Sequence, residues 1–131
     1  MRMAVLAATL IALQAKTTLD PVYTSGQATR GETVYTTSCS SCHAPDLSGS
    51  GQAPALAGKE FNEGWNGQTL ADLFDRIQTT MPADAPGSLK AADTADVMAF
   101  ILSKAMFPAG EVELPTEVAP LKEIKFVAPK Q

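Results

Sequence analysis

The sequence has few of the side chains that bind metals or fill a large aromatic core. Its 131 residues include two cysteines, one histidine and 6% aromatic residues. A structural zinc site uses four ligands, commonly Cys and His, and this chain has three such side chains, so zinc would have to recruit a carboxylate. The low aromatic content indicates a small core that a bound cofactor could complete.

Positive charge is also scarce. The net charge is −4, and residues 17–120 carry five basic against thirteen acidic side chains, whereas residues 121–131 are slightly basic. Binding to a nucleic-acid backbone requires the opposite sign, so no nucleic-acid partner is expected. The length fits one domain, since domains typically have about 100 to 150 residues.

The N-terminal segment has the order of a secretory signal peptide. Arg2 precedes an apolar run of eleven residues, and a small residue follows at Ala15. A membrane anchor is the alternative, but a spanning helix needs about 20 apolar residues, and polar side chains from Gln14 onwards end this run too early. The sequence therefore predicts a signal peptide at residues 1–15, a periplasmic or otherwise exported chain, and no stable membrane insertion.

Helical periodicity and capping signals predict an all-α domain. Thr24 and Thr69 each have a partner three residues on, Gln27 and Asp72, with which they can form a capping box at a helix start. A last helix is expected from about residue 90 to 104, with aspartates early and a lysine late as the helix dipole prefers.

Two segments rich in glycine or proline lie outside these helices. Residues 44–68 contain five glycines, which predicts a long loop that wraps around something. Repeated prolines after residue 105 predict a tail laid over the body, and its apolar side chains commonly serve packing. The expected division is a linker at 16–22, a domain at 23–105 and an extended C-terminal tail at 106–131.

The string from Cys39 to His43 reads Cys-Ser-Ser-Cys-His, and C-x-x-C-H is the attachment signature of c-type haem. Residues three apart at a helix end point the same way, so the sulfurs of Cys39 and Cys42 can add to the two vinyl groups along one haem edge. His43 then lies under the ring, where its imidazole can bind iron.

Two further interpretations of the motif have less support than haem attachment. A thioredoxin-like redox pair opens a helix in a βαβ unit, whereas Cys39 follows a predicted helix in a chain without strands. A disulfide between Cys39 and Cys42 is permitted in an exported protein, but it leaves His43 and the glycine-rich loop without a role. The export signal and a downstream Met-Pro pair favour haem.

A second iron ligand follows by elimination, because the single histidine excludes a bis-histidine haem within one chain. Met81, Met98 and Met106 remain once the signal peptide is removed. Met98 lies inside the last predicted helix, where a methionine usually fills core space, and Met106 lies just past it. Met81 is favoured because Pro82 stiffens its loop, and a thioether ligand raises the reduction potential.

In the order of these helices, motifs and loops along the sequence, the chain resembles class I cytochromes c over residues 23 to about 104. The resemblance rests on Gly31 and Tyr35 in the first helix, the Cys39–His43 motif, Pro54, Leu56 and Gly58 in the loop, Met81 and Pro82, and Phe100 in the last helix. It implies a cytochrome c fold in which helices wrap around one covalent haem c with its iron.

The resemblance also implies roles for single residues. The Pro54 carbonyl would accept the second N–H of His43, Leu56 would pack on the haem face, and Trp65 would lie near the haem propionates. Gly31 would admit Phe100 at a close helix crossing. Lys90 departs from the family, which usually has a Ser or Asp cap there.

The expected function is one-electron transfer by a carrier that is not an enzyme. Residues 107–115 are similar to small cytochromes associated with quinoprotein (PQQ) dehydrogenases, which suggests such a dehydrogenase as donor and a terminal oxidase or another cytochrome as acceptor. A haem peroxidase or ligand sensor is the alternative and requires an open sixth position, against which Met81 argues. A colourless zinc or disulfide module is the third class.

Overall fold

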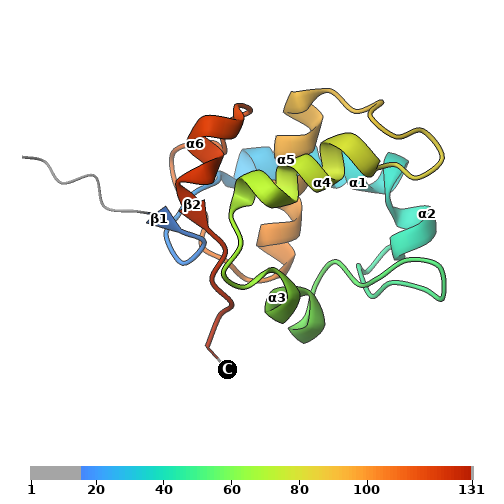
Figure 1. Cartoon of the computed structure of the whole chain (residues 1–131), viewed down its shortest axis with the longest axis horizontal. Coiled ribbons are helices and arrows are strands. Elements are labelled where there is room, and N and C mark those ends of the chain that lie inside the picture. Colours follow the sequence, from blue (N-terminus) through green and yellow to red (C-terminus); the bar gives the residue numbers. More distant parts are fainter. Residues whose placement is uncertain (1–15, 131) are drawn as a thin grey trace, which may run out of the picture.

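The computed structural model describes residues 16–130, so the predicted signal peptide at 1–15 lies outside the described residues. Helices dominate this part of the chain, which confirms the all-α class (Figure 1). The elements in chain order are β1 (Lys16–Thr17), α1 (Ser25–Ser38), α2 (Ser40–His43), α3 (Lys59–Trp65), α4 (Leu70–Thr80), α5 (Ala91–Lys104), α6 (Val118–Lys122) and β2 (Ile124–Lys125).

Helices α1 and α5 cross at Gly31, where the backbones touch. A Cβ atom at Gly31 would lie 1.8 Å from the Asp96 carbonyl oxygen and 2.9 Å from the Phe100 Cβ, so no larger residue fits. Tyr35, one turn later on α1, packs on Phe100 with ring centroids 5.2 Å apart. The close crossing expected at Gly31 is confirmed.

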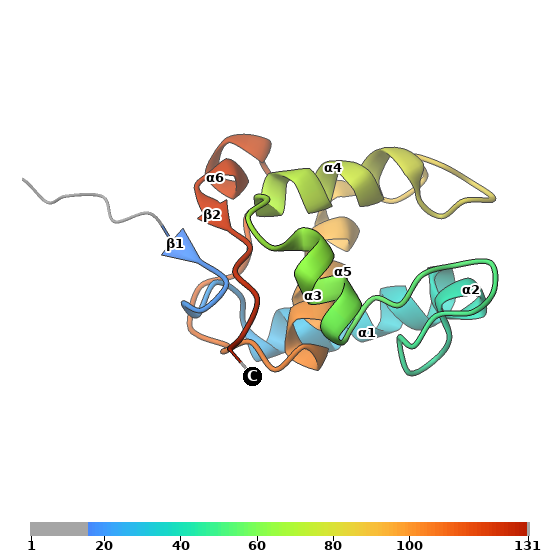
Figure 2. The same ribbon diagram turned by 60° about the horizontal axis from the view of Figure 1, so that its bottom comes forward.

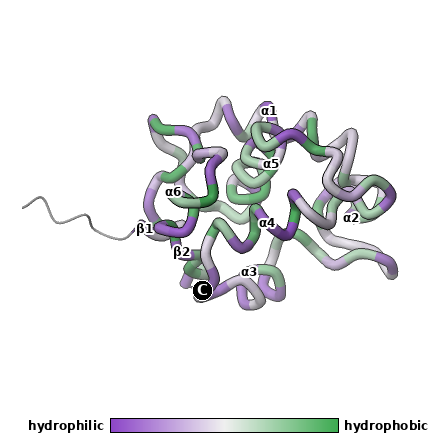
Figure 3. Tube along the Cα trace, turned by 45° about the horizontal axis from the view of Figure 1, so that its top comes forward, coloured by the Kyte–Doolittle hydropathy of each residue, from purple (hydrophilic) through white to green (hydrophobic). Residues whose placement is uncertain are grey.

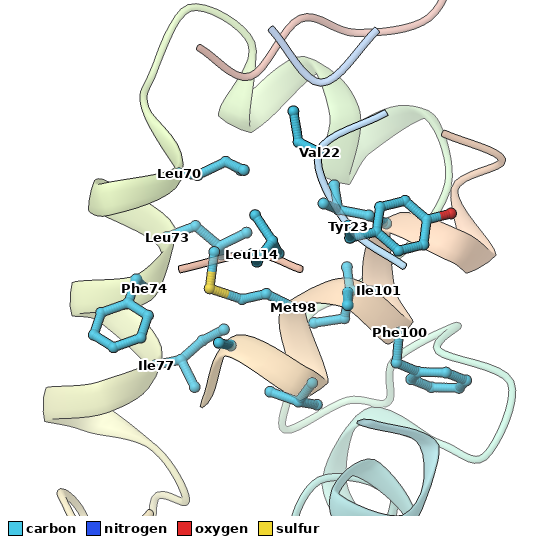
Figure 4. Close-up of a cluster of buried hydrophobic side chains, with 14 of the residues drawn as sticks. Val22, Tyr23, Leu70, Leu73, Phe74, Ile77, Met98, Phe100, Ile101 and Leu114 are labelled. Atoms are coloured by element: carbon cyan, nitrogen blue, oxygen red, sulfur yellow. The ribbon is translucent and has the colours of Figure 1, made fainter. Parts of the chain in front are cut away.

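Helix α5 is the centre of the core. Eight of its residues are buried, and Figure 3 shows it in hydrophobic shades in the middle of the molecule. The amphipathic α4 presents Leu73 and Ile77 to this helix, and Figure 4 shows both beside Met98. Met98 is fully buried, so its predicted role as core filler is confirmed.

The two expected capping boxes have different outcomes. At α4 the Thr69 side chain accepts from the Asp72 N–H and the Asp72 carboxylate accepts from the Thr69 N–H, as predicted. At α1 Thr24 accepts from the Gln27 N–H, but the Gln27 side chain does not return to it. Instead the buried Gln27 donates to the Leu114 carbonyl (3.2 Å) and accepts from the Leu114 N–H (2.8 Å). The expectation of a second box is wrong because the C-terminal segment binds this side chain.

The C-terminal residues are more structured than the predicted extended tail. They contain α6, and β2 pairs in parallel with β1, with Lys16 opposite Ile124. Pro120 is tolerated in α6 because the first turn of a helix has no partner for that N–H. The segment expected as a linker, 16–22, packs against the body through this pairing and through the buried Thr18 and Val22.

The segment 44–68 is not entirely the expected loop, because it contains α3. This helix follows Gly58, which has a φ of +94°, and its Asn66 cap donates to the Asn62 carbonyl. Its one buried side chain is Phe61. Because glycines lie on both sides of Phe61, no clear helical pattern is visible in the sequence there. Among residues 16–130, no helix has the length and apolar character needed to cross a bilayer.

Candidate functional site

The C-x-x-C-H residues form a single helical turn at the end of α1. The Cys39 carbonyl accepts from the Cys42 N–H (3.3 Å) and from the His43 N–H (3.0 Å), which closes α2. Both thiols are free, with Cys39 half-buried and Cys42 exposed. Because the two cysteines are one turn apart, their side chains lie on the same side of the turn.

Burial raises the pKa of the Cys39 thiol to about 11. A nucleophilic redox cysteine needs the opposite shift, because the thiolate is its reactive form. The environment of Cys39 therefore does not support thioredoxin-like chemistry. It does suit a sulfur that ends in a neutral thioether.

His43 is buried, and its ring orientation is fixed by one hydrogen bond. The His43 Nδ1 lies 2.7 Å from the Pro54 carbonyl oxygen. A carbonyl can only accept, so Nδ1 carries a proton, and in the neutral ring Nε2 is then the nitrogen with a free lone pair. This arrangement is the one that metal-binding histidines adopt, with the second nitrogen donating to a carbonyl or carboxylate.

The loop after α2 holds Pro54 in this position. Gly49 has a φ of +81°, and a Cβ atom there would lie 2.6 Å from the Ala55 nitrogen. The Gly49 N–H donates to the His43 carbonyl (2.8 Å), and the Leu56 N–H donates to the Leu47 carbonyl (2.9 Å). The close approach that Gly49 permits thus folds the loop back onto His43.

Tyr35 supports the other side of the turn. Its hydroxyl donates to the carbonyl of Ala44, the residue after His43, at 2.5 Å. Ala44 has a φ of +69°, a conformation that costs about 1 kcal/mol or more for a residue other than glycine. The hydrogen bond from the core therefore stabilises a strained residue next to the histidine. The sequence identified Tyr35 as a helix aromatic but not as a support of this turn.

The remaining predicted site residues share one property, which is partial exposure at the edge of the core. Apolar side chains of this kind pack against the core without being buried in it. They are Val34, Cys39, Leu56, Ala57, Trp65, Met81, Leu89 and Ala105. Leu56, Trp65 and Met81 thus have apolar surface with which they could contact a flat apolar group such as haem.

Met81 caps the end of α4, where its N–H donates to the Ile77 carbonyl. In both Figure 1 and Figure 2 the loop that follows lies at the same end of the molecule as α2. Met106, the other candidate, is 88% exposed. Of these two methionines, therefore, Met81 is the one that packs against the core.

One residue that the sequence did not suggest holds the Met81 loop. Gln78, in the last turn of α4, donates to the Leu89 carbonyl (2.6 Å) and accepts from the Thr94 hydroxyl (2.7 Å). It thereby ties the far end of the loop to both α4 and α5. A polar residue near a helix end gives no local signal of such a contact, because both partners lie more than ten residues away.

These features together define a c-type cytochrome domain: a helical body, a C-x-x-C-H turn with an oriented histidine, and a partly buried methionine at the end of α4. The chain belongs to the family described as Cytochrome C oxidase, cbb3-type, subunit III, which matches residues 26–101. The class I cytochrome c fold is thereby confirmed, and with it a covalent haem c with its iron and haem-based electron transfer.

A solved structure has a similar fold. It is the sulfane dehydrogenase SoxCD from Paracoccus pantotrophus, matched with a TM-score of 0.53 and 18% sequence identity over 82% of this chain. The match covers 61% of that other chain, so this chain spans less than two thirds of its length. The similarity concerns the fold alone. No curated protein matches the sequence significantly.

Proposed function

We propose that this chain is a periplasmic one-electron carrier whose haem is attached through Cys39 and Cys42, with His43 and Met81 as the iron ligands. The observation that carries this proposal is the 2.7 Å contact between His43 Nδ1 and the Pro54 carbonyl. It leaves Nε2 available for iron, in the residue that directly follows the second cysteine.

The bound haem supplies the redox centre, whose iron alternates between Fe(III) and Fe(II). The chain's own residues set the conditions for that change. A thioether from Met81 would raise the potential, and Leu56, which is partly buried against the core, would exclude water from one haem face. Trp65, half-buried at the end of α3, is proposed to flank the propionate side.

We further propose that a dehydrogenase, such as a quinoprotein, donates electrons and that a terminal oxidase or another cytochrome accepts them. The acidic charge of residues 17–120 favours a basic partner surface. Cys42 is exposed, which supports an attachment edge near the surface where a partner can approach. Such encounters suit a transient interface of less than about 1,200 Å² in total.

The attachment is tested on protein exported from a host that can couple haem to C-x-x-C-H motifs. The mature mass should include one haem, and acid-acetone extraction should not remove it. The same mass measurement shows whether the chain has been cleaved after residue 15. Haem that is extracted would exclude the covalent attachment, and a colourless protein would exclude haem and favour a zinc or disulfide module.

The iron ligand is tested by Met81→Ala with Met106→Ala as the matched control. Met81→Ala should abolish the weak far-red sulfur-to-iron band of the oxidised protein and lower the potential, whereas Met106→Ala should change neither. The opposite result would make Met106 the ligand. Absence of the band in the unmodified protein would favour an open sixth position, as in a peroxidase or ligand sensor.

The donor is tested by the bimolecular rate of reduction by a quinoprotein dehydrogenase. Electrostatic steering predicts a rate that falls with salt, since the Debye length is about 10 Å at 0.1 M. A rate that is independent of salt would show that charge does not steer the encounter with the dehydrogenase.

A further inference from the structure

Residues 124–128, here called the C-terminal strap, bind the segment that directly follows Trp65. The Gly67 N–H donates to the Phe126 carbonyl (2.9 Å), and the Phe126 N–H donates to the Gln68 carbonyl (2.7 Å). The Ala128 N–H donates to the Asn66 Oδ1 (2.8 Å). Two hydrogen bonds to the backbone and one to the Asn66 side chain thus hold the three residues that follow Trp65.

The strap also reaches the other side of Trp65 through a row of aromatic rings. Phe126 is fully buried and lies edge-on to Phe107 (centroids 5.4 Å, 80°) and to Phe61 (6.0 Å, 82°). Phe61 in turn packs on Trp65 with centroids 6.4 Å apart. Phe61 and Trp65 are four residues apart on α3 and therefore share a face of that helix.

The opposite edge of the strap is held by the N-terminal segment. The Thr18 N–H donates to the Lys125 carbonyl (3.0 Å). The Thr18 hydroxyl and the Val127 backbone bind each other through the Val127 N–H and carbonyl, both at 3.0 Å. Figures 1 and 2 both show β2 between β1 and the segment that joins α3 to α4. The strap is therefore fixed from behind and can act as a support for α3.

We propose that the C-terminal strap positions Trp65 against the haem, with Phe126 as the positioning residue. This inference rests on the proposed function, in which Trp65 flanks the haem. Phe126 acts on Trp65 through Phe61 and through the backbone of residues 66–68. A well-placed indole excludes water from that side of the haem and disfavours the more charged Fe(III) state, because burial and solvent access are among the factors that set a haem potential.

The test uses the haem-loaded protein with Phe126→Leu, which keeps an apolar side chain but removes the ring. The reduction potential should fall. Fluorescence of Trp65, the single tryptophan, should rise, because a haem at close range quenches an indole and the quenching weakens with distance. Asn66→Ala, which removes one exposed acceptor and leaves the core intact, should change both quantities in the same directions by less.

Leu121→Ala is the matched control for lost stability. Leu121 is as fully buried as Phe126 and lies in the same C-terminal region, but it is outside the aromatic row. Its variant should have a lower denaturation midpoint with unchanged potential and fluorescence. If Phe126→Leu and Asn66→Ala lower the midpoint and leave both signals unchanged, the strap is a structural element only and the proposal is wrong.

Repeating the Phe126→Leu substitution in a Trp65→Phe protein distinguishes a failure of the positioning role from a failure of haem attachment. In Trp65→Phe, Phe126→Leu should no longer shift the potential, because the residue through which it acts is absent. An equal shift in both backgrounds would overturn the positioning role. If Trp65→Phe itself leaves the potential unchanged in a protein with covalent haem, Trp65 does not flank the haem and the inference fails while haem attachment stands.

Discussion

Replacing Gly31 with alanine tests the crossing that joins the two ends of the domain. The added Cβ atom would lie 1.8 Å from the Asp96 carbonyl oxygen and 2.5 Å from its carbon. Both are backbone atoms of α5 and cannot rotate away. The two helices must therefore separate by roughly 1.5 Å to restore ordinary contact distances, since interiors are close-packed.

The cost of this separation can be set against the gain in helix propensity. Overpacking of a core costs about 1 to 3 kcal/mol, and the rigid backbone contact places Gly31 at the upper end. Alanine in mid-helix recovers about 1 kcal/mol relative to glycine. The expected net loss is about 2 kcal/mol. With a guanidinium m-value of about 3 kcal/mol/M, this loss lowers the midpoint by roughly 0.7 M.

Guanidinium titration of the haem-loaded protein, followed by far-UV circular dichroism, measures the difference. Gly26→Ala is the control in the same helix, because the nearest non-neighbouring atom to a Cβ there is 4.0 Å away. It should leave stability unchanged or raise it by up to about 1 kcal/mol. An unchanged midpoint for Gly31→Ala would show that α1 and α5 do not cross as closely as described.

Three further predictions concern the site. Gln78→Leu removes two hydrogen bonds worth about 1 kcal/mol each, so the Met81 loop should open more easily and added imidazole should bind the ferric haem up to about thirtyfold more tightly; unchanged affinity would show that Gln78 does not hold the Met81 loop. Burial raises the pKa of Tyr35 to about 12, so the folded state holds this proton more tightly than the unfolded chain. Stability should therefore fall as pH rises from about 10 to 12, less steeply in Tyr35→Phe, and an identical slope would exclude Tyr35 as a source. Cys39→Ala should leave a poorly folded chain by circular dichroism, and a cooperative, native-like melt would contradict this.

The parts of the fold that the sequence predicts well depend on neighbours within about four residues. The Thr69–Asp72 box and the turn from Cys39 to His43 are both local patterns. Gly31 is different, because its need for a close partner is visible in the sequence only as a cost within a helix. The resemblance to cytochromes c supplied Phe100 as the partner.

The parts that could not be predicted depend on contacts between distant segments. Gln27 has the spacing of a capping residue, but Leu114 offers its side chain both a donor and an acceptor in a buried position. The pairing of Lys16 with Ile124 joins segments from opposite ends of the described chain, and strands of two residues leave no periodicity to detect. Helix α3 is short and has glycine at its start and within it, so its propensity is low.

The tail also explains how a chain with few aromatic residues builds a core. Leu114, Leu121, Ile124 and Phe126 are all buried, so the C-terminal segment supplies a share of the core that the cytochrome-like residues 23–105 lack. Leu56, Trp65 and Met81 are partly buried and pack against this core. Each buried apolar side chain contributes about 1.5 to 3 kcal/mol, so a haem that covers these three side chains would add to the stability of the fold. Haem is therefore expected to stabilise the fold as well as to carry the electron.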